Sequence, residues 1–436
     1  MNSARVVITG LGAVTPLGLT VGDTWAGLCA GRVGIDKITA FDPVGFSCKL
    51  AGQVPEYRIQ NYVPKSFRKS VKLMSRDIEL VVIAANEAIT DSGLITKGID
   101  PEKVNVNPER IAINLGAALI SCDLVELAPA VAASINKGKF DIHKWGKDGL
   151  ELVTPLWLLK YLPNMLACHV GIIHDIQGPS NSITCAEASS HLAIAEAAHI
   201  IARGNSDIAV AGGAEAKVNP MVIIRQCLLK RAISDDDVEP ASACRPFDAG
   251  AKGSVFGEGA GVVVLENFDN ARARGARIYA EVVGFGQSNS IGEVYEHLEP
   301  NGYGLQIAIE KALADARIQP EDLDLIIPHG TAIPEDDLAE AAAIQSVLGK
   351  ATTNTAVWPT KSMLSNTGAA GGAIDVIAAV CAMSEDRIPA AKNCDKKAVN
   401  LNIATQPQKL NLNYVLCCSY TFGGQTAAIV LKRFNS

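Results

Sequence analysis

Short β-branched strands that end in glycine alternate with alanine-rich helical stretches along most of this 436-residue chain. The expected strands are residues 6–9, 208–213, 261–266, 325–328 and 426–431. These segments are apolar at nearly every position, so both faces of the sheet that they form have to be covered by helices. The pattern predicts an α/β protein with a mostly parallel sheet.

Two of the helical stretches are apolar almost all round. Residues 193–201 and 374–383 have alanine at many packing positions and very few charges. A helix without a polar face is buried on every side. We therefore expect these two helices to lie between layers of the fold rather than on its surface.

The beginning of the chain is repeated near residue 277. The segment from Arg5 reads as a strand, a glycine turn and a helix, and the segment from Arg277 restarts in the same order. At about 150 residues per domain, this length fits two or three domains or one large two-part unit. We expect two similar halves, residues 1–265 and 266–436. A less regular stretch, about 104–160, is expected to be a lid or dimer-interface insertion in the first half.

Composition excludes several classes of protein. Hydrophobic residues make up 48% of the chain and charged residues 19%, which excludes a disordered or fibrous protein. A net charge of −7 argues against general nucleic-acid binding. No run of eighteen apolar residues occurs, and no basic segment followed by an apolar one opens the chain. We expect a cytoplasmic protein with neither a nucleic-acid nor a membrane partner.

Neither the cysteines nor the first glycine pair indicates a metal or nucleotide site. The eleven cysteines include no Cys-x-x-Cys pair and lie mostly in apolar runs, so we interpret them as reduced structural residues without zinc. Gly10-Leu11-Gly12 follows the first strand, but Thr15 stands where the dinucleotide-binding pattern needs a third glycine. The pair instead predicts close packing of a strand against a helix.

Four polar segments carry the candidate chemistry. Residues 178–190 contain Cys185 and Glu187, and residues 328–340 contain His329. Residues 360–371 contain Lys361 and Asn366, and residues 419–425 contain Tyr420.

In their order, and with Arg245-Pro246-Phe247-Asp248 and Gly257-Glu258-Gly259-Ala260-Gly261 between them, these segments resemble the β-ketoacyl-acyl-carrier-protein synthases over essentially the whole chain. These are the elongating, type I/II branch of the thiolase superfamily. The resemblance implies a thiolase-like five-layered αβαβα fold of two duplicated halves and an obligate dimer. It also implies acyl transfer in fatty-acid or polyketide synthesis. The chain would hold no cofactor of its own, because an acyl carrier protein delivers the phosphopantetheine arm.

Matched residue by residue, the segments depart from the family pattern. The position of the nucleophilic cysteine is occupied by Glu187, and that of the second histidine by Asn366. The first histidine, the lysine and the aromatic residue before the last Phe-Gly-Gly match His329, Lys361 and Tyr420.

Cys185 is an alternative nucleophile only if the match contains an insertion. A shift of two residues turns a helical side chain by about 200°, which would direct the thiol away from His329. We therefore interpret Cys185 as a structural cysteine and take Glu187 as the residue at the nucleophile position.

Glu187 implies that normal condensation is lost, because a carboxylate cannot hold an acyl group as a thioester. We expect a chain-length-factor-like subunit, in a homodimer or in a heterodimer with an active ketosynthase. The alternative is a malonyl-carrier-protein decarboxylase or an altered condensing enzyme in which His329 and Asn366 polarise the thioester carbonyl. A general base is a third role for Glu187.

The charge of Glu187 bears on this choice. A helix N-terminus favours the anion, whereas burial favours the neutral acid, and the sequence leaves both open. An anion would repel a malonyl carboxylate by about 4 kcal/mol at 4 Å and an effective dielectric near 20.

Basic residues stand out in this acidic chain. Lys65, Arg68, Lys69 and Lys72 recur at helical spacing, and Lys230-Arg231 forms a second pair. They are either a solvated surface or, as the resemblance implies, the docking surface for the acidic carrier protein.

Overall fold

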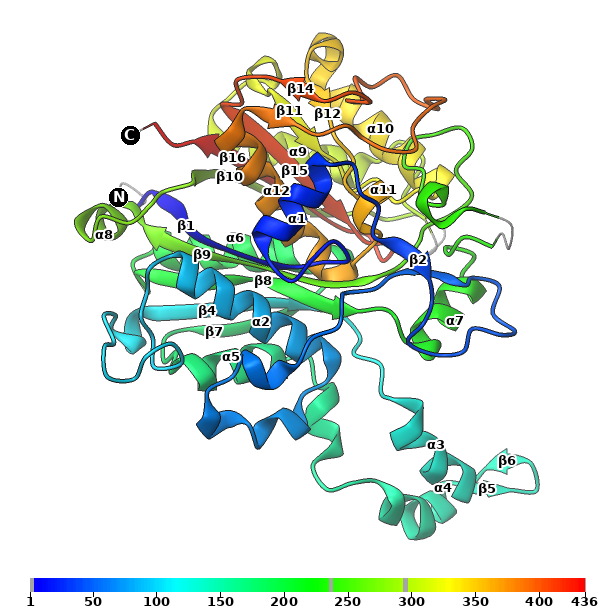
Figure 1. Ribbon diagram of the computed structural model, residues 1–436. Helices are drawn as coiled ribbons and strands as arrows, with labels where there is room; N and C mark the ends of the chain where they lie inside the picture. Colours follow the sequence, from blue (N-terminus) through cyan, green and yellow to red (C-terminus); the bar gives the residue numbers. More distant parts are fainter. Residues whose placement is uncertain (1–3, 235–237, 293–296, 436) are drawn as a thin grey trace.

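The computed structural model describes residues 4–234, 238–292 and 297–435. Its centre is a sheet of ten strands in the order β12-β11-β15-β16-β10-β1-β9-β8-β4-β7 (Figure 1). The strands of the first half are β1 (Val6–Val14), β4 (Ile111–Ala117), β7 (Ser180–Thr184), β8 (Ile208–Ala216) and β9 (Glu258–Asn267). Those of the second half are β10 (Ala280–Asn289), β11 (Leu325–Ile327), β12 (Ala356–Val357), β15 (Tyr414–Tyr420) and β16 (Gln425–Arg433).

The two sets of five strands have the same topology. In each set the first strand lies at the centre of the sheet, followed outward by the fifth, fourth, second and third. The two inner pairs of each set are antiparallel, and the two outer pairs are parallel. The sets join where β1 pairs with β10, antiparallel, from Val6↔Val282 to Ile8↔Ala280.

The sheet is therefore mixed, and the prediction of a mostly parallel sheet is wrong. Both faces of the sheet are covered by helices, so its antiparallel strands are as apolar as its parallel ones. The apolar content of a strand indicates that the strand is buried, but it does not indicate whether the strand runs parallel or antiparallel to its neighbours. The boundary suggested at residue 265 falls inside β9, which ends at Asn267.

Helices complete five layers (Figure 1). Those between the two halves of the sheet are α6 (Ser189–Ala202) and α12 (Gly371–Glu385). Those on the two outer faces are α2 (Arg76–Asp91), α5 (Met165–His174), α9 (Tyr303–Ala316) and α10 (Pro334–Leu348). The central pair contains the two all-apolar stretches identified in the sequence, and their predicted place between layers is confirmed.

The glycine pair after the first strand has a counterpart in the second half. A Cβ on Gly10 or Gly12 would lie 2.2 or 2.0 Å from a backbone oxygen of α2. A Cβ on Gly284 or Gly286 would lie 2.2 or 1.7 Å from a backbone oxygen of α9. Both pairs lie within a strand rather than in a turn, and they let the outer helix of each half pack directly on the sheet.

The stretch Gly368–Glu385 is long and apolar enough to cross a membrane by length and composition, with a mean hydropathy of 1.3. It comprises η12 (Gly368–Ala370) and α12, and 83% of it is buried inside the fold. Its apolar character is that of a core helix between two layers of sheet.

An arm projects from the first half (Figure 1). It contains α3 (Leu124–Ala133), the hairpin of β5 (Ile135–Asn136) and β6 (Lys139–Phe140), α4 (Ile142–Lys144), and the turns η5 (Trp145–Gly149), η6 (Leu150–Leu152) and η7 (Trp157–Tyr161). The insertion predicted at about residue 104 thus begins later, because residues 111–117 form β4 within the sheet. Val125, Ile142 and Leu156 of the arm are 86%, 64% and 61% exposed.

The remaining elements are shorter. They are α1 (Val21–Cys29), β2 (Ile35–Lys37), β3 (Leu50–Gly52), η1 (Ile59–Asn61), η2 (Lys65–Phe67), η3 (Ser70–Leu73), η4 (Pro108–Arg110), η8 (Ala186–Ala188), α7 (Pro220–Leu228), η9 (Pro240–Ser242), α8 (Phe268–Ala273), η10 (Pro320–Asp322), η11 (Gly349–Thr353), α11 (Lys361–Leu364), β13 (Arg387–Ile388) and β14 (Gln408–Lys409).

Candidate functional site

The four polar segments meet in the interior of the protein. Glu187 follows β7, His329 follows β11, Tyr420 ends β15, and Lys361 and Asn366 lie before α12. All five side chains are at most 2% exposed. The fold therefore brings together, as a buried cluster, the five residues that the sequence predicted as catalytic.

Glu187 sits on a sharp turn between β7 and α6. β7 ends at Thr184, and η8 occupies the next residues before α6 begins at Ser189. Ala186 has a φ of 44°, a left-handed conformation that costs energy in a residue with a side chain. The turn places Glu187 just ahead of the N-terminus of α6, where the anionic form is favoured.

The Glu187 carboxylate is paired with a lysine that the sequence pattern did not single out. Lys217 Nζ lies 2.9 Å from Glu187 Oε1 and 3.6 Å from Glu215 Oε1. Burial raises the pKa of Glu187, but attraction to Lys217 and then to Arg231 outweighs it and lowers the pKa to about 2. The charge that the sequence left open is therefore negative.

Lys217 is the matching cation. Burial lowers its pKa, but the two carboxylates beside it act more strongly in the other direction, so the pKa of Lys217 is raised. Burial raises the pKa of Glu215, the more distant of the two carboxyls. The close pair is thus an ammonium and the carboxylate of Glu187. The other oxygen of Glu187, Oε2, has no hydrogen-bond partner among the described residues.

His329 is held from two sides. Its backbone N–H donates to Glu340 Oε1 at 2.7 Å, and its ring meets the Tyr420 ring edge-on with the centroids 4.6 Å apart. Burial and the nearby Lys361 keep the pKa of His329 well below its usual value, so the imidazole is neutral. Within the described part of the chain, His329 Nδ1 has no hydrogen-bond partner.

Lys361 and Asn366 are fixed by local hydrogen bonds. Lys361 Nζ lies 2.9 Å from Asp375 Oδ2, and the Thr360 hydroxyl donates to Asp375 Oδ1 at 2.6 Å. Asn366 Oδ1 accepts from the Gly368 N–H at 3.0 Å. Asn366 Nδ2 is buried and donates to no described residue.

Cys185 lacks the lowered pKa of a reactive thiol, although it is partly exposed. Burial raises its pKa, which favours the neutral thiol over the nucleophilic thiolate. All eleven cysteines are free. No group of three or more His, Cys, Asp or Glu side chains suited to a metal ion occurs among the described residues.

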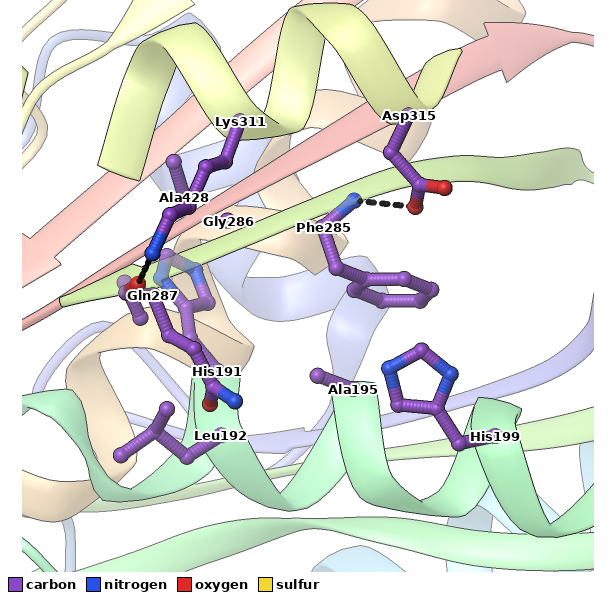
Figure 2. Close-up of a pocket in the computed structure, with 11 residues that line it drawn as sticks. His191, Leu192, Ala195, His199, Phe285, Gly286, Gln287, Lys311, Asp315 and Ala428 are labelled. Atoms are coloured by element: carbon purple, nitrogen blue, oxygen red, sulfur yellow. Dashed lines mark hydrogen bonds between the residues drawn. The ribbon is translucent and has the colours of Figure 1, made fainter. Parts of the chain in front are cut away.

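A cavity of about 360 Å³ lies on the second-half side of α6 (Figure 2). His191, Leu192, Ala195 and His199 of α6 line it together with parts of β10, β16 and α9. His191 Nδ1 lies 2.8 Å from the Ser419 hydroxyl, and burial lowers the pKa of His191 to about 3. The five predicted catalytic residues are not among those that line this cavity.

The predicted docking residues separate into two groups. Lys65, Arg68, Lys69 and Lys72 are exposed, although they do not share one α-helix. Lys65 lies on the 3-10 turn η2 and Lys72 on the 3-10 turn η3, and Arg68 and Lys69 lie between the two turns. Lys230 is also exposed.

Arg231 is not a surface residue, so its assignment to the docking surface is wrong. It is 2% exposed, lies 2.9 Å from Asp336 Oδ2 and sits over the Phe422 ring at 4.9 Å. Lys230 has a φ of 55°. This left-handed turn sends two successive basic side chains in different directions.

The residues that the sequence pattern missed are the ones that position the site. They are Glu215, Lys217, Glu340 and Asp375, and each is paired or hydrogen-bonded to a site residue or to its loop. One signal was present for the first two. Glu215 and Lys217 are two residues apart at the end of an apolar strand, and alternate residues of a strand share a face.

Comparison with known proteins covers nearly the whole chain. The family model "Beta-ketoacyl synthase, N-terminal domain" matches residues 3–271, and "Beta-ketoacyl synthase, C-terminal domain" matches residues 279–395. The 3-oxoacyl-[acyl-carrier-protein] synthase 2 of Vibrio cholerae is 34% identical over 99% of this chain and 100% of that protein. Its counterpart in Staphylococcus aureus is 33% identical over 100% of both.

Solved structures agree over the same length. A β-ketoacyl synthase from Burkholderia phymatum aligns with a TM-score of 0.85 and 28% identity, over 99% of this chain and 100% of that one. The ishigamide ketosynthase/chain length factor aligns with a TM-score of 0.81 and 27% identity at the same coverage. A type II polyketide acyl-carrier protein complexed with its ketosynthase supplies a third similar chain, with a TM-score of 0.83 and 25% identity over 99% of this chain and 100% of that one.

Proposed function

The chain belongs to the β-ketoacyl synthase family, and from this membership we propose that it is a non-condensing subunit of fatty-acid or polyketide-type synthesis, similar to a chain length factor. The observation that carries the proposal is the ion pair of Glu187 with Lys217 at the nucleophile position. Condensation requires a nucleophile that accepts an acyl group and releases it again. A buried, ion-paired carboxylate does not provide one.

The surface of the chain supports a protein partner. The arm exposes apolar side chains that include Val125 and Leu156, and large exposed apolar areas mark interaction sites. β7 is an edge strand, so one side of its backbone is free to pair with another chain. We propose that an active ketosynthase covers the arm and β7, as a cytoplasmic heterodimer. A homodimer is the other arrangement of the same surfaces.

An acyl carrier protein is the proposed second partner. The exposed cluster of Lys65, Arg68, Lys69 and Lys72, with Lys230, provides positive charge on an acidic chain. Opposite charges accelerate and orient the encounter of two proteins. The phosphopantetheine arm would come with the carrier, and we propose no cofactor held by this chain itself.

The test of the partner proposal is co-expression with a family member that retains the cysteine nucleophile. We expect a stable one-to-one complex in size-exclusion chromatography with light scattering. Val125→Asp and Leu156→Asp should abolish it, whereas Val44→Asp, at an 80% exposed position outside the arm, should not. A chain that stays monomeric with every such ketosynthase tested contradicts the proposal.

Decarboxylation of a malonyl thioester is the second candidate function. Two buried nitrogens, His329 Nδ1 and Asn366 Nδ2, have no hydrogen-bond partner among the described residues. The Glu187–Lys217 pair is neutral as a whole, so it repels a malonyl carboxylate less than an isolated carboxylate would.

In this reaction the bond between the carboxylate carbon and Cα breaks, and carbon dioxide leaves. The electron pair remains on the substrate as an enolate whose oxygen accepts hydrogen bonds from the site. A proton from water then goes to Cα and gives the acetyl thioester.

Incubation with malonyl-carrier protein separates the two functions. If the chain is only a partner subunit, no acetyl-carrier protein forms above the background without protein. Formation of acetyl-carrier protein that is lost in His329→Ala and Asn366→Ala, but kept in the exposed-histidine control His199→Ala, would establish the second function.

A further inference from the structure

We propose that Lys217 is a positioning residue that fixes the charge and the orientation of the side chain at position 187. The biological meaning of this inference rests on the proposed function, but its test needs neither a carrier protein nor a partner subunit.

The ammonium group of Lys217 lies within reach of two carboxylates. Lys217 follows β8 directly, and its Nζ lies 2.9 Å from Glu187 Oε1. Glu215, two residues earlier on the same face, contributes Oε1 at 3.6 Å. The other oxygen of Glu215 accepts from the Ala369 N–H at 2.8 Å. The ammonium thus lies between two carboxylates, one of which is anchored to the backbone of the opposite half.

The ion pair of Lys217 and Glu187 is enclosed by its neighbours. The Phe256 ring lies 5.1 Å from Lys217 Nζ. Gly368, with a φ of +60°, packs so closely that a Cβ there would lie 2.3 Å from Lys217 Cε and 1.8 Å from Glu215 Oε2. The Lys217 side chain is 3% exposed. The ammonium group is thus packed among Phe256, Gly368 and the two carboxylates, and the side chains of both partners in the ion pair are at most 3% exposed.

Other charged and titratable groups also face Glu187 and Lys217. Arg231, which follows α7, is committed to Asp336 at 2.9 Å, and His329, which follows β11, is neutral. Glu215, on β8, carries the same sign as Glu187, and Arg225 on α7 acts on Lys217 and Glu215. Lys217 is therefore the cation that hydrogen-bonds Glu187.

Removal of the ammonium takes away the strongest attraction that lowers the pKa of Glu187 and leaves the attraction of Arg231. Burial, the largest influence on this carboxyl, then favours its neutral form. In the native protein the lowered pKa means that Glu187 adds stability above the ordinary carboxyl pKa, and that this stability is lost as the pH falls toward 2. In Lys217→Met the folded-state pKa would lie above the ordinary value, so stability would fall as the pH rises.

The experiment compares urea unfolding of the wild type, Lys217→Met, Lys217→Arg, Glu187→Gln and the double variant Glu187→Gln/Lys217→Met between pH 3 and pH 8. Lys350→Met, at an exposed lysine on η11, is the matched control. Relative to the wild type, the unfolding equilibrium constant of Lys217→Met should rise with pH, by up to about tenfold per unit while one carboxyl titrates. The double variant should lose the part of this pH dependence that comes from Glu187 and keep the part that comes from Glu215, which also faces Lys217. Lys217→Arg should restore the wild-type profile, and Lys350→Met should follow the wild type.

A loss of stability in Lys217→Met that is the same at every pH would overturn the proposal, as would a double variant with the same pH profile as Lys217→Met. If Lys217→Met does not fold, the double variant decides: folding of the double variant supports the proposal, and its failure to fold overturns it. Loss of complex formation with a ketosynthase would count against the proposed function alone, because none of these unfolding measurements involves a partner.

Discussion

Glu340 accepts the backbone N–H of His329 at 2.7 Å with one carboxylate oxygen and that of Gly330 at 2.8 Å with the other. A side chain of α10 thereby holds the loop that carries the histidine. Glu340 is 0% exposed, so the backbone of His329 is set by a contact that solvent does not reach.

Replacement of Glu340 by glutamine should destabilise the protein in a pH-dependent manner. Burial raises the pKa of Glu340 to about 8, and the two N–H groups oppose this only in part. A raised folded-state pKa means that the contribution of Glu340 is complete below the ordinary carboxyl pKa and is lost as the pH rises through 8. The cost of Glu340→Gln should therefore be largest near pH 4 and shrink with pH, by at most about 1.4 kcal/mol per unit.

The measurement for this prediction is urea unfolding of wild type and variant at pH 5 and pH 8. Glu335→Gln, on the exposed side of the same helix, is the control and should change stability by less than about 0.5 kcal/mol. A cost that grows with pH would show that Glu340 is ionised in the folded protein.

Gly368 should tolerate no side chain. Gly368→Ala would place a methyl group 1.8 Å from Glu215 Oε2, at a backbone φ of +60°. Gly275→Ala is the control, because Gly275 has a φ of +67° and a methyl group there would meet nothing within 4 Å. The control should cost about 1–2 kcal/mol through backbone conformation alone. Thermal unfolding should show a clearly larger loss for Gly368→Ala, and equal losses would mean that the loop yields.

Replacement of the adjacent residues Lys230 and Arg231 should have very different effects on the free energy of unfolding. Arg231→Met leaves Asp336 buried without its arginine, which typically costs about 3–5 kcal/mol. Lys230→Met changes an exposed side chain and should cost less than about 0.5 kcal/mol. Denaturant unfolding of the two variants provides the comparison. Arg231→Met/Asp336→Asn should recover part of the loss, because it removes the unpaired charge, and no recovery would argue against the ion pair as the cause.

Charge reversal of Lys65, Arg68, Lys69 and Lys72 to glutamate should slow association with an acyl carrier protein. All four are exposed. Interactions between exposed charges are screened within about 10 Å at 0.1 M salt. We expect the association rate to fall at least tenfold at low salt, and the difference from the wild type to shrink as salt is added.

Surface plasmon resonance at several salt concentrations measures this association rate. Reversal of the exposed Lys311 and Lys350 is the control, because both lie in the second half, outside the cluster. An unchanged rate would place the docking surface elsewhere on the chain.

The central helices and the cluster of five site residues followed from local patterns. An all-apolar helix has to be buried, and ordered polar segments after strands converge where the ends of those strands meet. The direction of the strands could not be predicted from the sequence. β9 and β16 are as apolar as the parallel strands, although they run antiparallel to their neighbours. The burial of Arg231 beside an exposed Lys230 could not be predicted from the sequence either. This difference in burial depends on the left-handed backbone angle of Lys230.

Residue identity and order by themselves predicted Glu187 at the position of the family's nucleophile, together with His329, Lys361, Asn366 and Tyr420. Only the tertiary structure decided the charge of Glu187. That charge depends on the distance to Lys217, on how far both are shielded from water, and on which other cations are already paired. Electrostatic energy varies with separation and dielectric environment, and neither quantity exists until the chain has folded.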